Sequence, residues 1–194
     1  MESNEILSVT SFLPEKKPKK LFFLLHGYGD SSENFIHIAN SLHQPQWKIN
    51  YFGLNGPNTI PNYPLGRQWF DLYPNKIYIA DAGPNEIKII KKEILIASKA
   101  IENIIKKIST NYGLSYCDCF LIGFSQGGMM AFEFGNYLEH CLGGIGILSG
   151  QILNENNLNN SDFLKTPIFI SHGEKDDVLD VSVFYKACKY LKKK

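Results

Sequence analysis

Short apolar runs alternate with amphipathic stretches along most of the chain, and this alternation limits the possible folds more than any other feature. The predicted strands are residues 6–13, 21–25, 48–54, 117–124, 142–148 and 167–171. The predicted helices are residues 33–42, 84–112, 126–139 and 181–192. From residue 21 onward the strand runs are mostly continuous, which is typical of parallel strands covered on both faces. The pattern therefore predicts an α/β fold, with a mostly parallel sheet and helices on both faces.

The helix predicted over residues 84–112 has the clearest pattern. Its apolar positions recur at alternating steps of three and four, and they are Ile87, Ile90, Ile94, Ala97, Ile101, Ile104 and Ile108. Pro84 suits the first turn of a helix, and Gly113 suits the residue after its end. We therefore expect one long helix with a single apolar stripe against the sheet.

The chain length and composition predict one domain, residues 1–194. Hydrophobic residues make up 44% of the 194 residues, enough for a full core. No internal repeat and no Gly/Ser or Pro linker divides the chain, and the Asn-rich residues 151–165 are predicted to form an exposed loop. Ligands in open α/β sheets bind at the carboxyl ends of the strands, so the functional residues are expected there.

The charge balance argues against a nucleic-acid partner or an anionic membrane. Lys and Arg number 20 against 19 Asp and Glu, and Arg67 is the only arginine. The N-terminus is acidic and polar, unlike a secretory signal, and the longest apolar run, residues 21–25, is too short to span a bilayer. A soluble cytoplasmic protein without an integral membrane span is the expectation.

The four cysteines fit neither a disulfide framework nor a zinc pattern. They are Cys117, Cys119, Cys141 and Cys188. Cys117 and Cys119 lie two apart in an apolar run, so we expect them to share one face of a strand as packing thiols. No H-E-x-x-H pattern is present either. No metal site is predicted.

The sequence Gly123-Phe124-Ser125-Gln126-Gly127-Gly128 stands between a predicted strand and a predicted helix. This G-x-S-x-G pattern in that context predicts a sharp turn that lifts the Ser125 hydroxyl clear of the sheet as a nucleophile. The glycines allow the cramped backbone, and the N-terminus of the following helix would stabilise an oxyanion. The alternative is a Gly-rich turn whose serine only caps the helix.

Two further polar clusters follow predicted strands. His26-Gly27-Tyr28-Gly29-Asp30 comes after residues 21–25, and its glycines let the backbone approach a ligand, unless it is an ordinary turn. After residues 167–171 comes His172-Gly173 with Asp176. Asp176 fits the chain order of serine, then acid, then histidine. Asp177 and Asp180 are local competitors that would by default stabilise the N-terminus of the next helix.

These motifs resemble those of the acyl-protein thioesterase, carboxylesterase and phospholipase group of small α/β-hydrolases. The resemblance runs from about Leu21 to the last residue and includes Gly56-Pro57 and Gly66-Arg67-Gln68-Trp69-Phe70-Asp71. It implies the α/β-hydrolase fold and cleavage of acyl esters or thioesters, of small molecules or lipids, without a cofactor.

The resemblance also implies residue roles. Ser125 would be the nucleophile and Asp176 the acid of a catalytic triad, while the main-chain amides of Tyr28 and Gln126 would form the oxyanion hole. Trp69 and Phe70 would line the acyl pocket; the alternative is that both belong to an ordinary aromatic core.

The chain departs from this family at the histidine that accepts the serine proton. The five histidines are His26, His37, His43, His140 and His172, and none follows Asp176. A helix takes up most of the 18 residues after Asp176, so the last strand and its histidine loop are expected to be missing and the domain incomplete at its C-terminus. His26 and His172 match histidines of the family's own motifs and are expected to be structural. Three alternatives stay open: a serine hydrolase of acyl esters or thioesters whose histidine is supplied by an unseen segment or a second chain, a truncated relative that is inactive or nearly so, or a non-catalytic relative that binds acyl ligands or acts as an interaction module.

Overall fold

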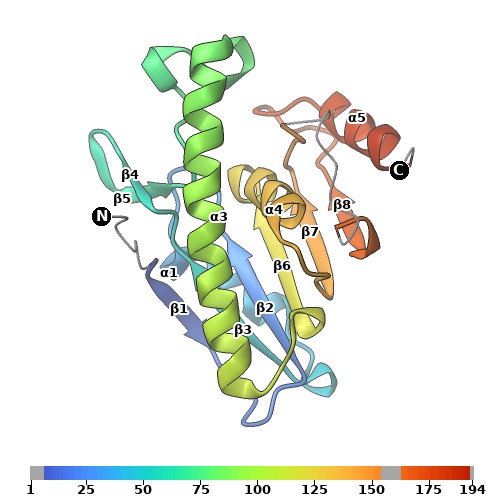
Figure 1. Cartoon of the computed structure of the whole chain (residues 1–194). Coiled ribbons are helices and arrows are strands. Elements are labelled where there is room, and N and C mark those ends of the chain that lie inside the picture. The colour runs from blue at the N-terminus through green and yellow to red at the C-terminus, as the bar shows by residue number, and fades with distance from the viewer. Residues whose placement is uncertain (1–6, 154–162, 193–194) are drawn as a thin grey trace.

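The computed structural model describes residues 7–153 and 163–192, and it contains a six-stranded sheet with helices on both faces (Figure 1). The strands of this sheet are β1 (Val9–Phe12), β2 (Lys20–Leu25), β3 (Ile49–Leu54), β6 (Cys119–Phe124), β7 (Gly144–Leu148) and β8 (Ile168–Ser171). Their spatial order is β1-β3-β2-β6-β7-β8. Only β1 runs antiparallel to its neighbour, so the prediction of a mostly parallel α/β sheet is confirmed.

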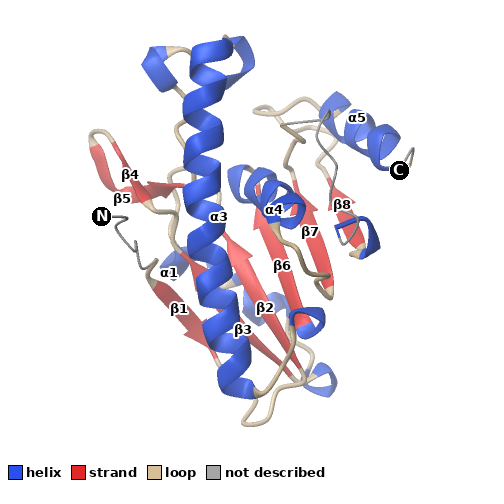
Figure 2. Cartoon of the chain, in the orientation of Figure 1, coloured by secondary structure: helices blue, strands red, loops and turns tan. Residues whose placement is uncertain are grey.

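Helices are interspersed with the strands along the chain, and Figure 2 distinguishes the two by colour. They are α1 (Ser32–Phe35), α2 (Ile38–Leu42), α3 (Pro84–Tyr112), α4 (Gln126–Tyr137) and α5 (Ser182–Leu191). None of them, in the part of the chain that the structure describes, is both long and apolar enough to cross a membrane.

Side chains alternate across the sheet and build two separate cores. On β2, Leu21, Phe23 and Leu25 join the larger core, which also holds buried residues of α3 and α4. Leu24 points to the opposite face and packs in a smaller core with residues of α1 and α2. Because successive residues of a strand point to opposite faces, this division follows directly from the continuous apolar runs of the sequence.

Helix α3 has the predicted bounds. Gly113 adopts a left-handed conformation (φ 65°) directly after it, and Pro84 is its first residue. The stripe is largely buried, with Ala97 and Ile101 fully covered, whereas Ile87 at its start is 42% exposed.

The helix predicted over residues 33–42 is wrong in one respect, because it is broken into α1 and α2. The N–H of Ala39 bonds to the carbonyl of Ile36 at 3.0 Å, three residues back, and this tighter turn separates the two short helices. Apolar residues of both pieces pack in the smaller core.

The prediction that Cys117 and Cys119 share a strand face is also wrong. Residues Tyr116–Asp118 form a 3-10 turn, and β6 begins only at Cys119. Asp118 stabilises this turn by accepting the N–H of Ser115 at 3.1 Å. Cys117 is therefore exposed, while burial of Cys119 raises the pKa of its thiol to about 12.

Two strands were not predicted. β4 (Asn58–Ile60) and β5 (Tyr63–Gln68) pair antiparallel as a separate hairpin. The prolines and glycines of this segment indicate turns, and tertiary contacts overrule that preference: the N–H of Gly29 donates to the carbonyl of Arg67 and the N–H of Arg67 to that of Asp30, both at 3.0 Å. The loop predicted for residues 151–165 lies mostly outside the described residues, and Phe163 within it is buried.

Candidate active site

Ser125 stands at the turn between β6 and α4, at the carboxyl edge of the sheet. Its backbone has φ 50° and ψ −116°, a conformation that residues with a side chain rarely adopt. The turn is held in place by the N–H of Ser125, which donates to the carbonyl of Leu148 on β7 at 2.8 Å. The sharp bend predicted from the G-x-S-x-G pattern is therefore present.

The glycines on either side of Ser125 are required by close backbone contacts. A Cβ atom at Gly123 would collide with the carbonyl of Gly127, and one at Gly127 would collide with the carbonyl of Leu25. Helix α4 thus begins directly against β6 and the end of β2. This close approach sets the N-terminus of α4 beside Ser125, where its dipole is positive.

The loop that follows β2 lies beside this turn, because Leu25 pairs with Gly123 across the sheet. The loop contains Tyr28. The main-chain N–H of Tyr28, like that of Gln126, donates to no main-chain carbonyl among the described residues. Two N–H groups without main-chain partners, one in the loop after β2 and one in the first turn of α4, can bind an oxyanion. The side chain of Tyr28 is partly exposed.

The side chain of Gln126 has a role that the sequence did not reveal. Its Oε1 accepts the N–H of Trp69 at 3.0 Å, and its Nε2 donates to the carbonyl of Phe70 at 2.7 Å. Trp69 in turn donates its indole N–H to the carbonyl of His26 at 2.9 Å. Gln126 therefore ties the first turn of α4 to the segment after β5 and, through Trp69, to the loop after β2.

Trp69 and Phe70 are both completely buried in the larger core. Neither side chain is exposed to solvent. The Gln126 side chain joins their main-chain groups to the first turn of α4, next to Ser125. The predicted lining of an acyl pocket by these two residues stays a prediction.

His26 is fixed as a structural residue by its hydrogen bonds. Its Nε2 accepts the N–H of Gly56 at 2.9 Å, so the proton sits on Nδ1, which donates to the carbonyl of Gly27 at 2.7 Å. Burial lowers the pKa of this imidazole and keeps it neutral. Both ring nitrogens are occupied, so His26 has no lone pair available for the Ser125 proton.

Asp176 lies in the loop after β8, with its side chain 18% exposed. The N–H groups of Leu179 and Val178 donate to its Oδ1, each at 2.9 Å, and these bonds hold the pKa of the carboxyl below its ordinary value. The Nε2 of His172 donates to the carbonyl of Leu179 at 2.8 Å and lies 3.6 Å from Oδ2 of Asp176. Asp176 is therefore an ionised carboxylate held in a fixed orientation.

The competing carboxylates differ from Asp176 in exposure and contacts. Asp180 is exposed and accepts the N–H of Ser182 at 2.9 Å, directly at the start of α5. It has the helix-terminal role expected of it. Asp177 is also exposed.

Sheet topology relates these groups to one another. Tyr28, Ser125 and Asp176 follow β2, β6 and β8. These strands are parallel neighbours in the order β2-β6-β7-β8, so their carboxyl ends share one edge (Figure 1). Neighbouring strands are about 4.8 Å apart, which puts the ends of β6 and β8 about 10 Å from each other. The structure thus brings Tyr28, Ser125 and Gln126 together and sets Asp176 two strands away.

No histidine in the part of the chain that the structure describes hydrogen bonds to the Ser125 hydroxyl. His140 stacks on Tyr116 with ring centroids 4.7 Å apart, near the start of β6 and therefore at the opposite edge of the sheet. His43 packs edge-on against Phe12 and Tyr51, and His37 directly precedes α2. The described residues also bring together no group of three His, Cys, Asp or Glu side chains that could hold a metal ion.

Curated proteins similar to this chain are fungal acyl-protein thioesterases. Acyl-protein thioesterase 1 of Yarrowia lipolytica is 29% identical over 161 residues, which are 80% of this chain and 68% of that protein. Acyl-protein thioesterase 1 of Saccharomyces cerevisiae is 28% identical over 181 residues, 87% of this chain and 75% of that protein. This chain, with 194 residues, is shorter than these relatives.

Solved structures with the same fold are esterases. Esterase PE8 superposes with a TM-score of 0.80 at 25% identity, covering 97% of this chain and 84% of that one. The carboxylesterase of Bacillus cereus, at 15% identity, shows the fold alone, with a TM-score of 0.75 and coverage of 99% and 82%. The α/β-hydrolase fold predicted from the sequence is thereby confirmed. The phospholipase/carboxylesterase family model matches residues 5–194, and the chain belongs to this family of α/β-hydrolases.

Proposed function

We propose that the chain carries the active centre of a serine hydrolase that cleaves acyl esters or thioesters. In this proposal Ser125 is the nucleophile, Asp176 is the acid, and the N–H groups of Tyr28 and Gln126 bind the oxyanion. The observation that carries the proposal is the strained backbone of Ser125 at the N-terminus of α4. Strain of this kind persists at sites where it serves the chemistry, and here it presents a hydroxyl to the carboxyl edge of the sheet.

The proposed reaction proceeds in two steps. The Ser125 oxygen attacks the acyl carbonyl carbon and a tetrahedral oxyanion forms, which the two N–H groups stabilise. The bond to the leaving alcohol or thiol then breaks, and the leaving group takes up the proton that Ser125 lost. Water hydrolyses the resulting acyl-serine by the same route and regenerates the hydroxyl.

Among the described residues, none contacts the Ser125 hydroxyl as the base that would take this proton. The two histidines nearest to the site by topology are His26, whose nitrogens are both engaged, and His172, which lies beyond β8 with Asp176. A serine that lacks its histidine typically loses about 10⁴–10⁶ in kcat, while oxyanion stabilisation remains. We therefore expect the 194 residues alone to react slowly with acyl substrates.

The same observation favours a second candidate function. A chain of this family without a base beside its serine could bind acyl ligands, or a partner, without turning them over. The two candidates share the fold and the site and differ in the reactivity of Ser125. That reactivity is what the experiment measures.

The test compares the wild-type chain with the Ser125→Ala variant. A fluorophosphonate probe is expected to label the wild type slowly and the variant not at all. Release of p-nitrophenolate from p-nitrophenyl acetate is measured with and without imidazole. Imidazole in solution can replace a missing histidine as the base. We expect imidazole to accelerate the wild type beyond the background that it produces with Ser125→Ala.

Equal rates for wild type and Ser125→Ala at every imidazole concentration, together with no labelling of a folded chain, would reject the hydrolase. Binding of a fatty acid under the same conditions, without turnover, would then support the non-catalytic binder. Asp177→Asn serves as a matched control for Asp176→Asn, because both carboxylates lie in the same loop and only Asp176 is assigned to the site. With imidazole present, only the change at Asp176 is expected to lower the rate of the wild-type serine, because a triad carboxylate acts by orienting the imidazole that takes the serine proton.

A further inference from the structure

Two turns of the chain lie directly against each other at the amino edge of the sheet, the edge where the parallel strands begin. One is the segment between β1 and β2, and the other is the 3-10 turn Pro45–Trp47 with Lys48, just before β3. β1 leaves the sheet where β3 begins, because these two strands are antiparallel neighbours. The N–H groups of Lys19 and Lys20 both donate to the carbonyl of Lys48, at 2.8 and 3.4 Å. Both turns lie at the lower end of the sheet in Figure 1, opposite to the candidate active site.

The side chains of these two turns concentrate positive charge. Four of their lysines are exposed and make no ion pair with any residue that the structure describes: Lys16, Lys17, Lys19 and Lys48. Lys20 differs from them, since its Nζ lies 3.1 Å from Oδ1 of Asp118. Glu15 is the one acidic side chain of the two turns, and it is half-buried. The formal charge of +1 averages over the whole chain and therefore conceals this local excess.

An exposed tryptophan stands next to these lysines. Trp47 directly precedes Lys48 and is 51% exposed, whereas Trp69, the other tryptophan of the chain, is completely buried. The turn that carries Trp47 has a fixed shape, because the N–H of Trp47 donates to the carbonyl of Gln44 at 2.9 Å. Leu13, directly after β1, is 50% exposed at the same edge. The two turns thus combine a large amphipathic ring with a group of unpaired ammonium groups.

We propose that this lysine–tryptophan surface, formed by Lys16, Lys17, Lys19, Trp47 and Lys48, docks on an anionic lipid bilayer. The ammonium groups are attracted to the charged headgroups, and the indole inserts at the level of the headgroups, where tryptophan is enriched in membrane proteins. None of the cations is an arginine, whose planar fork favours carboxylates held in fixed positions. Lysine is a flexible point charge, which suits lipid headgroups that move laterally. In this orientation the carboxyl edge of the sheet faces away from the bilayer.

The proposal predicts that the position of the lysines decides the affinity and that the net charge does not. Each lysine near an anionic bilayer should raise the affinity about fivefold. The test variant therefore combines four substitutions and should bind about a hundredfold or more weakly than the wild type: Lys16→Gln, Lys17→Gln, Lys19→Gln and Lys48→Gln. The matched control has the same net charge and changes four exposed lysines of α3 and α5: Lys88→Gln, Lys92→Gln, Lys186→Gln and Lys189→Gln. The control should bind far more tightly than the test variant.

The experiment measures co-sedimentation of the full chain with two kinds of vesicle, one of phosphatidylcholine alone and one of equal parts phosphatidylcholine and phosphatidylserine. We expect the chain to bind the anionic vesicles more tightly, and added salt should weaken this binding because it screens exposed charges. Tryptophan emission gives a second measurement. It should shift to shorter wavelength on binding, and the shift reports on Trp47, because Trp69 is already buried. The Trp47→Phe variant should show no such shift.

Three results would overturn the proposal: equal binding to both kinds of vesicle, equal binding by the test variant and its control, or tryptophan emission that does not shift on the anionic vesicles. Tighter binding to soluble polyglutamate than to the anionic vesicles would assign the surface to an acidic protein and would also overturn it. Circular dichroism verifies that each variant is folded. Ser125→Ala should bind the vesicles as the wild type does, so the result does not depend on the hydrolase proposal.

Discussion

The main-chain N–H of Trp69 donates a hydrogen bond to the side-chain Oε1 of Gln126 across 3.0 Å. The two residues are 57 positions apart, and both are buried. This bond joins the segment after the β4–β5 hairpin to the first turn of the helix that follows Ser125. One glutamine side chain therefore links the stability of the hairpin to the geometry of the site.

Replacement of Gln126 by Leu should destabilise the fold by about 3 kcal/mol. The substitution leaves the N–H of Trp69 and the carbonyl of Phe70 buried and unpaired, at about 1–3 kcal/mol for each. The free energy of unfolding in urea measures the effect. Gln68→Leu is the control, because the Gln68 side chain makes one hydrogen bond, to the carbonyl of Thr59 at 3.2 Å. Equal losses for the two variants would contradict the role given to Gln126.

Replacement of Ser125 by Gly should give a more stable protein than replacement by Ala. The φ of 50° strains any residue with a Cβ atom, at about 1–3 kcal/mol, and glycine removes that strain. Glycine also loses more backbone entropy on folding, which offsets about 0.5–1 kcal/mol of the gain. Urea unfolding of both variants should show Ser125→Gly ahead by about 1 kcal/mol. A more stable Ser125→Ala would mean that the turn is not strained.

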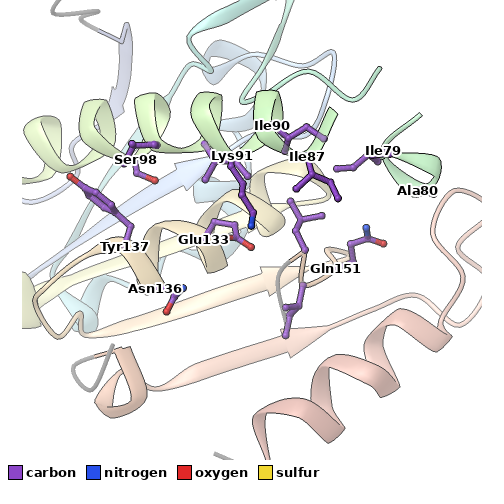
Figure 3. A pocket seen from close by; sticks show the side chains of 15 residues that line it. Ile79, Ala80, Ile87, Ile90, Lys91, Ser98, Glu133, Asn136, Tyr137 and Gln151 are labelled. Atoms are coloured by element: carbon purple, nitrogen blue, oxygen red, sulfur yellow. The ribbon is translucent and has the colours of Figure 1, made fainter. Parts of the chain in front are cut away.

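Glu133, which lines a cavity between α3 and α4 (Figure 3), should lower the free energy of unfolding of the wild type as the pH rises from about 4.5 to about 7. Burial raises the pKa of this carboxyl from 4.5 to about 7, so the folded state binds the proton more tightly than the unfolded state. This loss of unfolding free energy is complete above about pH 7 and amounts to about 3 kcal/mol at most. The difference in unfolding free energy between Glu133→Gln and wild type should grow from pH 5 to pH 8. Glu139→Gln should show no such growth.

Replacement of Phe169 by Thr should reduce self-association. Phe169 is 64% exposed on β8, the outer strand of the sheet among the described residues. An apolar residue on an unpaired strand edge favours pairing with another chain. Light scattering during concentration of the protein measures the effect. Val178→Thr removes an apolar residue that is even more exposed (82%) but lies in a loop, and it should aggregate as the wild type does.

Local patterns predicted the elements whose structure depends on their own residues. Helix α3 has its predicted bounds because Pro84, Gly113 and the apolar stripe all act within one segment. The helix over residues 33–42 was predicted as one piece because both halves carry apolar residues of the same small core, and the tighter turn between Ile36 and Ala39 leaves no mark in that pattern. The hairpin was missed because its pairing depends on contacts of Arg67 with Gly29 and Asp30, which lie far away in the sequence.

The sequence by itself determined the order of strands and helices, the family and the turn that bears Ser125, because each depends on residues close together in the chain. Only the tertiary structure decided that Gln126 bonds to the main chain of Trp69 and Phe70, that both nitrogens of His26 are engaged, and that Glu133 lines a cavity between α3 and α4. These relationships join segments that are distant in sequence. Hydrogen bonding and burial depend on which groups the packed fold brings together, and no local pattern contains that information.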